Sequence, residues 1–337
     1  MSKFILILLC VFSFTKLYAQ SSGEFVFNVL NTPFSPRMAV LNQPIAIVDK
    51  DVNVGVLNPS VLNDEMHHQI SMNFVDYFSD INFVEAAYAF PLKDFGTLST
   101  SFKNVSYGQF IQTDFSANQQ GTFSASEQLI TIGCSKLIFP KIRLGTNVKM
   151  VLSSLESYNS VALASDIAIS YFDEKSTWSF SFLARNIGRQ INQYTSISET
   201  IPFTLDFGAS KKLEHLPFKF TIGYNNLNRF DLTYSGLYET EIEESNAMGF
   251  GNKLFSHFEF GGELTIAKRV DLRFGYNALK RNELKVNSYL GTVGFSWGMG
   301  VQLNSFRIDF GRSTYHLHGS PNYFSVSSNL NQFFSKR

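Results

Sequence analysis

Most of the chain consists of short stretches in which apolar and polar residues alternate. In residues 218–224, with the sequence FKFTIGY, the first, third, fifth and seventh residues are apolar, and Lys, Thr and Gly separate them. Because successive side chains of a strand point to opposite faces, this pattern gives one apolar and one polar face. It recurs in 142–150, 258–266, 270–276 and 306–310. A period of two predicts β-strands and not helices.

The alternating segments are long for the strands of a soluble protein. Lengths of about ten or eleven residues match the tilted span of an outer-membrane barrel. Segments of this kind can be placed about fourteen times, and an even number allows an up-and-down meander to close. The predicted strands are 67–77, 81–91, 96–107, 127–138, 141–152, 161–172, 177–187, 203–213, 217–227, 257–267, 269–279, 289–300, 303–314 and 322–330.

The connections between these segments alternate in length after a tight first one. Short turns on one side and long loops on the other are typical of outer-membrane barrels. We therefore predict an all-β fold, an antiparallel up-and-down transmembrane β-barrel, with a soluble β-sandwich as the alternative that alternation alone leaves open. The predicted long loops are 108–126, 153–160, 188–202, 228–256, 280–288 and 315–321, and the short turns include 139–140 and 214–216.

Two segments precede the predicted barrel at 67–337. Residues 1–19 have Lys3, an apolar run over 4–14 and a small residue, Ala19, which together are typical of a cleaved signal peptide. Residues 20–66 lack the alternation but contain many apolar side chains. We predict that they fold into the lumen as a hatch or plug, the alternative being a strap along the periplasmic end. The expected location is the outer membrane of a Gram-negative bacterium, with the barrel surrounded by outer-membrane lipids.

Charge and cysteine content exclude several classes of protein. The chain has 28 Lys and Arg against 28 Asp and Glu, and no basic block, which argues against a nucleic-acid partner. Of the two cysteines, Cys10 lies in the signal peptide, so no disulfide framework is available. Cys134 alternates with Ile130 and Ile132 and is predicted to face lipid.

The polar faces of the predicted strands carry both signs of charge. A pore that selects one kind of ion usually presents a ring of a single sign. Mixed charges favour a lumen in which they pair with one another or with the plug. The predicted lumen residues are Lys141, Arg143, Lys149, Asp206, Lys219, Glu259, Glu263, Asp271, Arg273, Arg307 and Asp309.

The sequence gives no reason to expect an enzyme, a cofactor or a metal. It contains no Gly-x-Ser-x-Gly elbow and no glycine-rich phosphate loop between a strand and a helix. His316 and His318 supply only two of the ligands that a zinc site needs. Four glutamates of the longest loop could collect calcium, but charged loop tips are more often simply solvated.

Five segments together resemble the PorQ family of the Bacteroidetes type IX secretion system. They are 37–41, 49–60, 68–81, 153–158 and 310–320. Within the second, Asn58, Pro59 and Ser60 are similar to the Asn-Pro-Ala element in the hatch of FadL-like barrels, a group related also to PorV. The resemblance covers essentially the whole chain after the signal peptide. It implies a fourteen-stranded barrel plugged by an amino-terminal hatch.

The resemblance also implies a function without catalysis. Such a barrel would anchor a PorZ-like surface protein beside a PorU-like sortase and a PorV-like barrel, in the complex that joins exported cargo to anionic lipopolysaccharide. The alternatives are a FadL-like uptake channel for hydrophobic small molecules, which needs an apolar pocket at the lumen mouth, and a PorV-like cargo shuttle. We expect the partner to contact loop 228–256, helped by 108–126 and 188–202. The candidate contact residues are Tyr238, Glu239, Glu241, Glu243 and Glu244.

Overall fold

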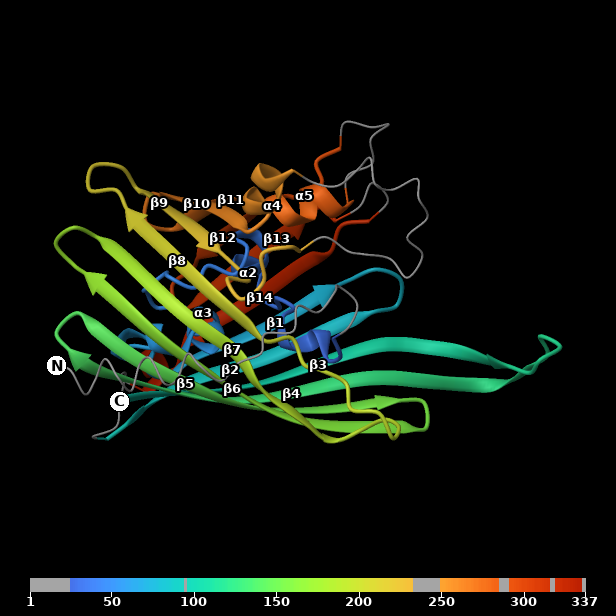
Figure 1. Cartoon of the computed structure of the whole chain (residues 1–337). Coiled ribbons are helices and arrows are strands. Elements are labelled where there is room, and N and C mark those ends of the chain that lie inside the picture. Colours follow the sequence, from blue (N-terminus) through green and yellow to red (C-terminus); the bar gives the residue numbers. More distant parts are fainter. Residues whose placement is uncertain (1–24, 94–95, 233–248, 285–290, 316–318, 335–337) are drawn as a thin grey trace, which may run out of the picture.

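Fourteen antiparallel strands close into one barrel in the computed structural model, in which β1 pairs with β14 (Figure 1). The structure describes residues 25–93, 96–232, 249–284, 291–315 and 319–334. The predicted barrel and its strand number are confirmed. The strands are β1 Gln69–Asp76, β2 Asn82–Leu92, β3 Gly96–Thr113, β4 Gln119–Phe139, β5 Ile142–Leu155, β6 Tyr158–Asp173, β7 Trp178–Asn192, β8 Thr204–Lys212, β9 Phe218–Tyr224, β10 Phe258–Ile266, β11 Val270–Asn277, β12 Phe295–Gln302, β13 Phe306–Ser313 and β14 Asn322–Asn329.

The two ends of the barrel differ in their connections. One, which we call the short-turn end, holds the turns 140–141, 174–177 and 267–269, together with the start of β1 and the end of β14. The other is the long-loop end, where the helices α4 (Phe250–Phe255) and α5 (Ala278–Leu284) lie (Figure 1). This separation follows from the alternation of long and short connections along the sequence.

Strands β3 and β4 continue past the long-loop end as a two-stranded ribbon (Figure 1). Pairing of β3 with β2 ends at Ser106, and pairing of β4 with β5 ends at Ala125, yet β3 and β4 stay paired to Thr113 and Gln119. The prediction of a loop over 108–126 is therefore wrong for most of its length. The ribbon has no lipid on one side and lumen on the other, so its ladder continues without the alternation that marks a membrane strand.

Other predicted strand boundaries also differ from the observed ones. The strand expected at 289–300 begins only at Phe295, and the helix α5 forms the first part of the connection that precedes it. The signal peptide and the candidate contact residues 238–244 lie outside the described residues, so both stay predictions. None of the described helices is long and apolar enough to cross a membrane.

The wall of the barrel is apolar outside and polar or small inside. On β1, Met72 and Phe74 are 61% and 43% exposed, while Ser71 and Asn73, which alternate with them, are buried. The same alternation puts Ile132 outside and Thr131 inside on β4, with Cys134 on the outer face as predicted. An exposed apolar band over a closed sheet is the expected surface of a barrel surrounded by lipid.

Residues 25–66 fill the lumen and form the predicted plug (Figure 1). This hatch contains two short helices, α2 (Pro36–Val40) and α3 (Val52–Leu57), and three single turns, η1 (Asn28–Leu30), η2 (Pro59–Val61) and η3 (Asp64–Met66). Ser35 caps α2 by accepting from the Met38 N–H, and Asp51 caps α3 through the Asn53 N–H. The alternative of a strap outside the lumen is excluded for these residues.

Small residues of the wall allow α2 to touch it. The Ser296 hydroxyl donates to the Val40 carbonyl over 2.7 Å, and Gly275, Gly298 and Gly311 lie beside the same helix on β11, β12 and β13. A Cβ at Gly275 would be only 1.7 Å from the Val40 carbonyl oxygen. Backbone contact at this distance requires a residue without a side chain.

We expect Gly275→Ala to loosen the hatch while the barrel still closes. Overpacking of this kind costs about 1–3 kcal/mol, and here the backbone of α2 must move. The measurement is the rate at which a water-soluble maleimide labels Ala39→Cys, a buried hatch position, in a Cys134→Ser background. Closure of the barrel is followed by heat-modified migration on gels.

The control is Gly223→Ala on β9, where the added Cβ would make only an ordinary contact of 3.5 Å with Asn225 Oδ1. Equal labelling of the Gly275 and Gly223 variants would show that close approach of α2 does not hold the hatch.

Candidate functional site

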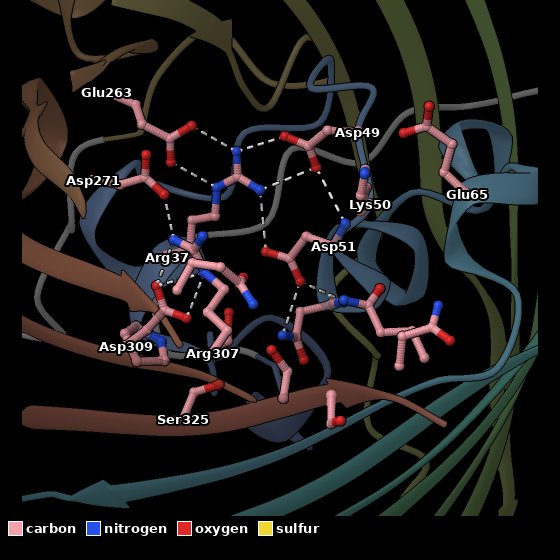
Figure 2. Close-up of a pocket in the computed structure, with 18 of the residues that line it drawn as sticks. Arg37, Asp49, Lys50, Asp51, Glu65, Glu263, Asp271, Arg307, Asp309 and Ser325 are labelled. Atoms are coloured by element: carbon pink, nitrogen blue, oxygen red, sulfur yellow. Dashed lines mark hydrogen bonds and ion pairs between the residues drawn. The ribbon is translucent and has the colours of Figure 1, made fainter. Parts of the chain in front are cut away.

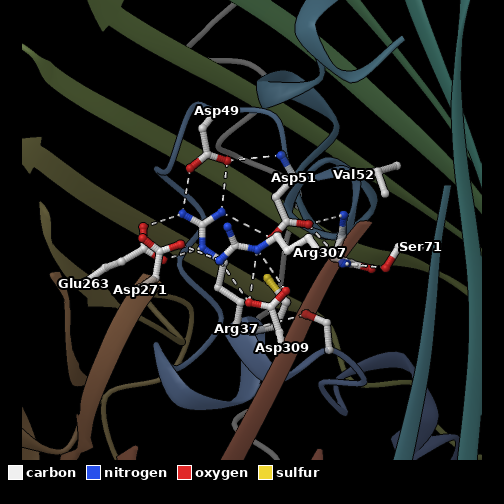
Figure 3. A network of polar contacts seen from close by, with 12 residues as sticks. Arg37, Asp49, Asp51, Val52, Ser71, Glu263, Asp271, Arg307 and Asp309 are labelled. Atoms are coloured by element: carbon white, nitrogen blue, oxygen red, sulfur yellow. Dashed lines mark hydrogen bonds and ion pairs between the residues drawn. The ribbon is translucent and has the colours of Figure 1, made fainter. Parts of the chain in front are cut away.

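A buried arginine of the hatch is the centre of an ion-pair network in the lumen (Figures 2 and 3). The Arg37 guanidinium lies 2.6 Å from Asp49 Oδ2 and 3.2 Å from Asp51 Oδ2, both in the hatch. Its other edge faces Glu263 of β10 at 2.8 Å from Oε1, and Nε also donates to this carboxylate. This fork holds hatch and wall together with directional, charge-assisted hydrogen bonds.

The network continues through the wall of the barrel. Arg273 of β11 contacts Glu263 Oε2 at 2.7 Å and Asp309 Oδ1 of β13 at 2.6 Å. Arg307, also on β13, pairs with Asp309 at 2.9 Å and with Asp271 of β11. Lys219 of β9 also reaches Asp49 at 2.9 Å, so the network joins the hatch to β9, β10, β11 and β13.

Opposite charges keep Arg37 and Asp49 ionised in spite of their burial. Burial alone would raise the pKa of Asp49, but the charges of Arg37 and Lys219 outweigh it and hold this pKa well below its usual range. Burial alone would lower the pKa of Arg37, whereas Asp49 and Glu263 raise it well above its usual value. The network contains four cationic side chains and five carboxylates, so removing one member leaves charge buried without a partner.

A polar chamber of about 620 Å³ lies next to this network, at the short-turn end (Figure 2). Its lining includes Lys50, Glu65, Lys268 and Ser327 in addition to members of the network. Such a surface holds water and polar groups and offers no apolar wall to a hydrophobic molecule. The chamber therefore ends at a hatch fixed by charge.

The predicted hatch motif anchors the plug to the opposite side of the wall. Asn58 donates to the Ile45 carbonyl at 2.6 Å and accepts from the Ser60 N–H, and the Ser60 hydroxyl lies 2.6 Å from the hydroxyl of Ser170 on β6. A Cβ at Gly145 of β5 would lie 2.3 Å from the backbone of Pro59. Asn58, Pro59 and Ser60 are all buried and act as a structural clamp.

A second pocket, of about 470 Å³, lies at the long-loop end, and we call it the mouth pocket. It is formed between the first hatch residues, the upper parts of β3 to β6 and the connection 193–203. The amide of Val26 donates to the Thr200 carbonyl at 3.1 Å and joins two of these parts. Much of its lining is apolar: Phe25, Val26, Phe27, Tyr107, Leu155, Tyr158, Tyr194 and Ile197.

The structure assembles these two sites from residues that the sequence had only partly identified. Most of the predicted lumen charges pair with one another or with the plug, as predicted. Arg143 instead donates to the Leu62 carbonyl, Glu259 accepts from the Asn277 amide, and Lys141 lies in a turn and pairs with Asp173 outside the lumen. Arg37 and the aromatic lining of the mouth pocket were not predicted. The available signal was Arg37, the only arginine of residues 25–66, in a segment that also carries Asp49 and Asp51.

Metal binding finds little support in the described part of the chain. There, no group of three His, Cys, Asp or Glu side chains is placed to hold a metal ion. His316, His318 and the glutamates of the 228–256 loop lie outside the described residues, so nothing further is said of them.

The chain is similar to solved outer-membrane barrels but to no family model and to no curated protein. The toluene transporter TbuX of Ralstonia pickettii is 10% identical with a TM-score of 0.53, over 90% of this chain and all of that one. The toluene transporter TodX of Pseudomonas putida is 11% identical with a TM-score of 0.45, over 93% of this chain and 98% of that one. A FadL homologue of Pseudomonas aeruginosa is 8% identical with a TM-score of 0.46, over 88% of this chain and all of that one. At these identities the likeness shows the barrel fold alone.

We expect Arg37→Met to release the hatch from the wall. The substitution keeps an apolar stem but leaves three contacting carboxylates without this partner, a cost of about 3–5 kcal/mol for a broken buried pair. Maleimide labelling of Ala39→Cys should then accelerate by about a hundredfold or more, since each 1.4 kcal/mol is a factor of ten.

Arg312→Met serves as the control, because Arg312 is an exposed arginine that donates to Asn322 Oδ1 at 3.1 Å. If Arg37→Met labels no faster than Arg312→Met, the ion-pair network does not hold the hatch.

Proposed function

We propose that this protein is a non-enzymatic outer-membrane barrel that anchors a surface protein, in the manner implied by its resemblance to the PorQ family. The partner would be PorZ-like, close to a PorU-like sortase and a PorV-like barrel, in the complex that attaches exported cargo to anionic lipopolysaccharide. The observation that carries this proposal is the hatch fixed in the lumen by Arg37 and its carboxylates. A barrel sealed in this way is suited to hold a partner in place.

The ribbon of β3 and β4 supports the same function. It projects past the long-loop end, where the proposal puts the cell surface, and it presents Ile111 and Phe115 at 58% and full exposure (Figure 1). Phe110 and Phe123 stack at 5.2 Å along it. Exposed apolar side chains on a projecting element are typical of surfaces that another protein covers. The ribbon therefore adds to the contact area expected from loop 228–256.

The test is co-purification from outer membranes through a carboxyl-terminal tag, in mild detergent. We expect a large surface protein to be recovered with the barrel in near-equal amount. Shortening 232–252 to a tight turn should release it, and replacing 109–123 by a two-residue turn should reduce its recovery. Both variants keep every strand pair below Ser106 and Ser126 and should still migrate as closed barrels.

The control for the ribbon is Thr113→Ser, which alters the same strand without removing apolar surface. Partner retention at the level of the unaltered protein after both deletions would contradict these contact surfaces. Recovery of the intact protein without any surface protein would contradict anchoring itself.

A FadL-like uptake channel is the second candidate, and the mouth pocket is the observation that favours it. This pocket supplies the apolar lining at the lumen mouth that the channel hypothesis requires. The solved neighbours include two proteins described as toluene transporters. A cargo shuttle like PorV would share the fold, and no feature of the described residues favours it over the other two.

If the channel hypothesis holds, Leu155→Trp should fill the mouth pocket and lower the uptake of radiolabelled toluene by intact cells severalfold. Leu144→Trp, on the same strand but on the outer face, is the matched control. Uptake unchanged by Leu155→Trp, or equal to that of cells lacking the protein, would count against transport.

A further inference from the structure

We propose that the mouth pocket binds an organic cation with an apolar body, such as an alkyl or aryl ammonium compound. This inference concerns a ligand site and goes beyond anchoring, so it stands whether or not a surface partner is found. It rests on the chemistry of one side chain, Glu127, and on the residues that surround it.

Glu127 differs from the other carboxylates that are fully buried in the described part of the chain, a set that does not include the half-buried Glu259. Seven carboxylate residues are buried in the described part of the chain, and six of them lie within 4 Å of a lysine or arginine nitrogen. Glu127, only 5% exposed, makes no such ion pair there. The six paired residues are Glu85, Asp166, Asp206, Glu263, Asp271 and Asp309.

Neutral groups hold the Glu127 carboxylate in place. The Tyr107 hydroxyl donates to Oε2 at 2.9 Å, and the Val29 amide and the Ser153 hydroxyl also hydrogen-bond to the side chain. These donors satisfy its hydrogen bonds but bring no positive charge. Burying a carboxylate without a counter-charge costs free energy. A positively charged ligand would therefore gain the ion-pair energy that no lysine or arginine of the described residues provides.

The rest of the pocket matches an apolar cation in shape and sign. Tyr107, Tyr158 and Tyr194 present aromatic surface, and the faces of such rings attract cations, more strongly where water is excluded. The only other charged residue among the described lining is Glu199, which is also acidic, and the lining contains no Lys, Arg or His. A ligand with its own carboxylate would be repelled. The volume of about 470 Å³ suits a molecule with a phenyl ring and a short chain.

The test uses three probes with one body and different heads: 4-phenylbutylamine, 4-phenylbutanol and 4-phenylbutyrate. Binding to the full barrel in zwitterionic lipid nanodiscs is measured by calorimetry at pH 7, with empty nanodiscs as the background for partition into lipid. The amine should bind at least about tenfold more tightly than the alcohol, and the butyrate weakest.

Two substitutions separate charge from shape. Glu127→Gln keeps the size of the side chain and an acceptor for Tyr107, and it should remove the preference for the amine while leaving the affinity for the alcohol unchanged. Glu156→Gln, an exposed change of the same charge in the neighbouring turn, should alter neither. Leu155→Trp should abolish binding of every probe, with gel migration reporting a closed barrel.

Butyrate binding as tight as amine binding, an amine preference that survives Glu127→Gln, or no saturable binding of any probe would each overturn the proposal. None of these results depends on whether the barrel co-purifies with a surface protein.

Discussion

The interior of this barrel depends on one constraint: the arginine of the hatch can be buried only where carboxylates form ion pairs with it. Arg37 meets two from its own segment and Glu263 from the wall. Glu263 in turn is shared with Arg273, which reaches Asp309 on β13. Because Asp49, Glu263 and Asp309 each pair with more than one cation, the position of the hatch and the register of β10, β11 and β13 support one another.

Steric fit between hatch and wall also holds the hatch in place. Gly275, Gly298 and Gly311 leave room for α2, and Gly145 leaves room for the Asn58-Pro59-Ser60 turn on the other side of the lumen. The contacts lie on opposite sides of the plug, so it cannot shift toward one wall without losing the other. Packing of this density makes the lumen a protein core, with apolar clusters such as Val52, Leu62 and Met66 against Ala87.

The two ends of the barrel consequently have different chemistry. The short-turn end leads to a polar chamber closed by paired charges, whereas the long-loop end presents an apolar pocket, an unpaired buried carboxylate and a projecting ribbon. The proposed surface partner and the proposed cation would both bind at the long-loop end. The two proposed sites lie at different places, since the ribbon extends beyond the long-loop end and Glu127 lies within the closed wall of the barrel.

The period-two pattern, together with the lengths of the segments and of their connections, predicted the fold class, the number of strands and the outer face, because a strand between lipid and lumen must alternate. The pattern failed outside the membrane-spanning wall: the ribbon of β3 and β4 was predicted to be a loop, and the strand predicted at 289–300 begins only at Phe295. Mixed charge on the polar faces also predicted a paired lumen. Only the tertiary structure decided which charges pair, and that Glu127 forms no ion pair with any lysine or arginine of the described residues. Arg37 and Glu263 are 226 residues apart, and closure of the barrel around the hatch is what brings them within hydrogen-bonding distance.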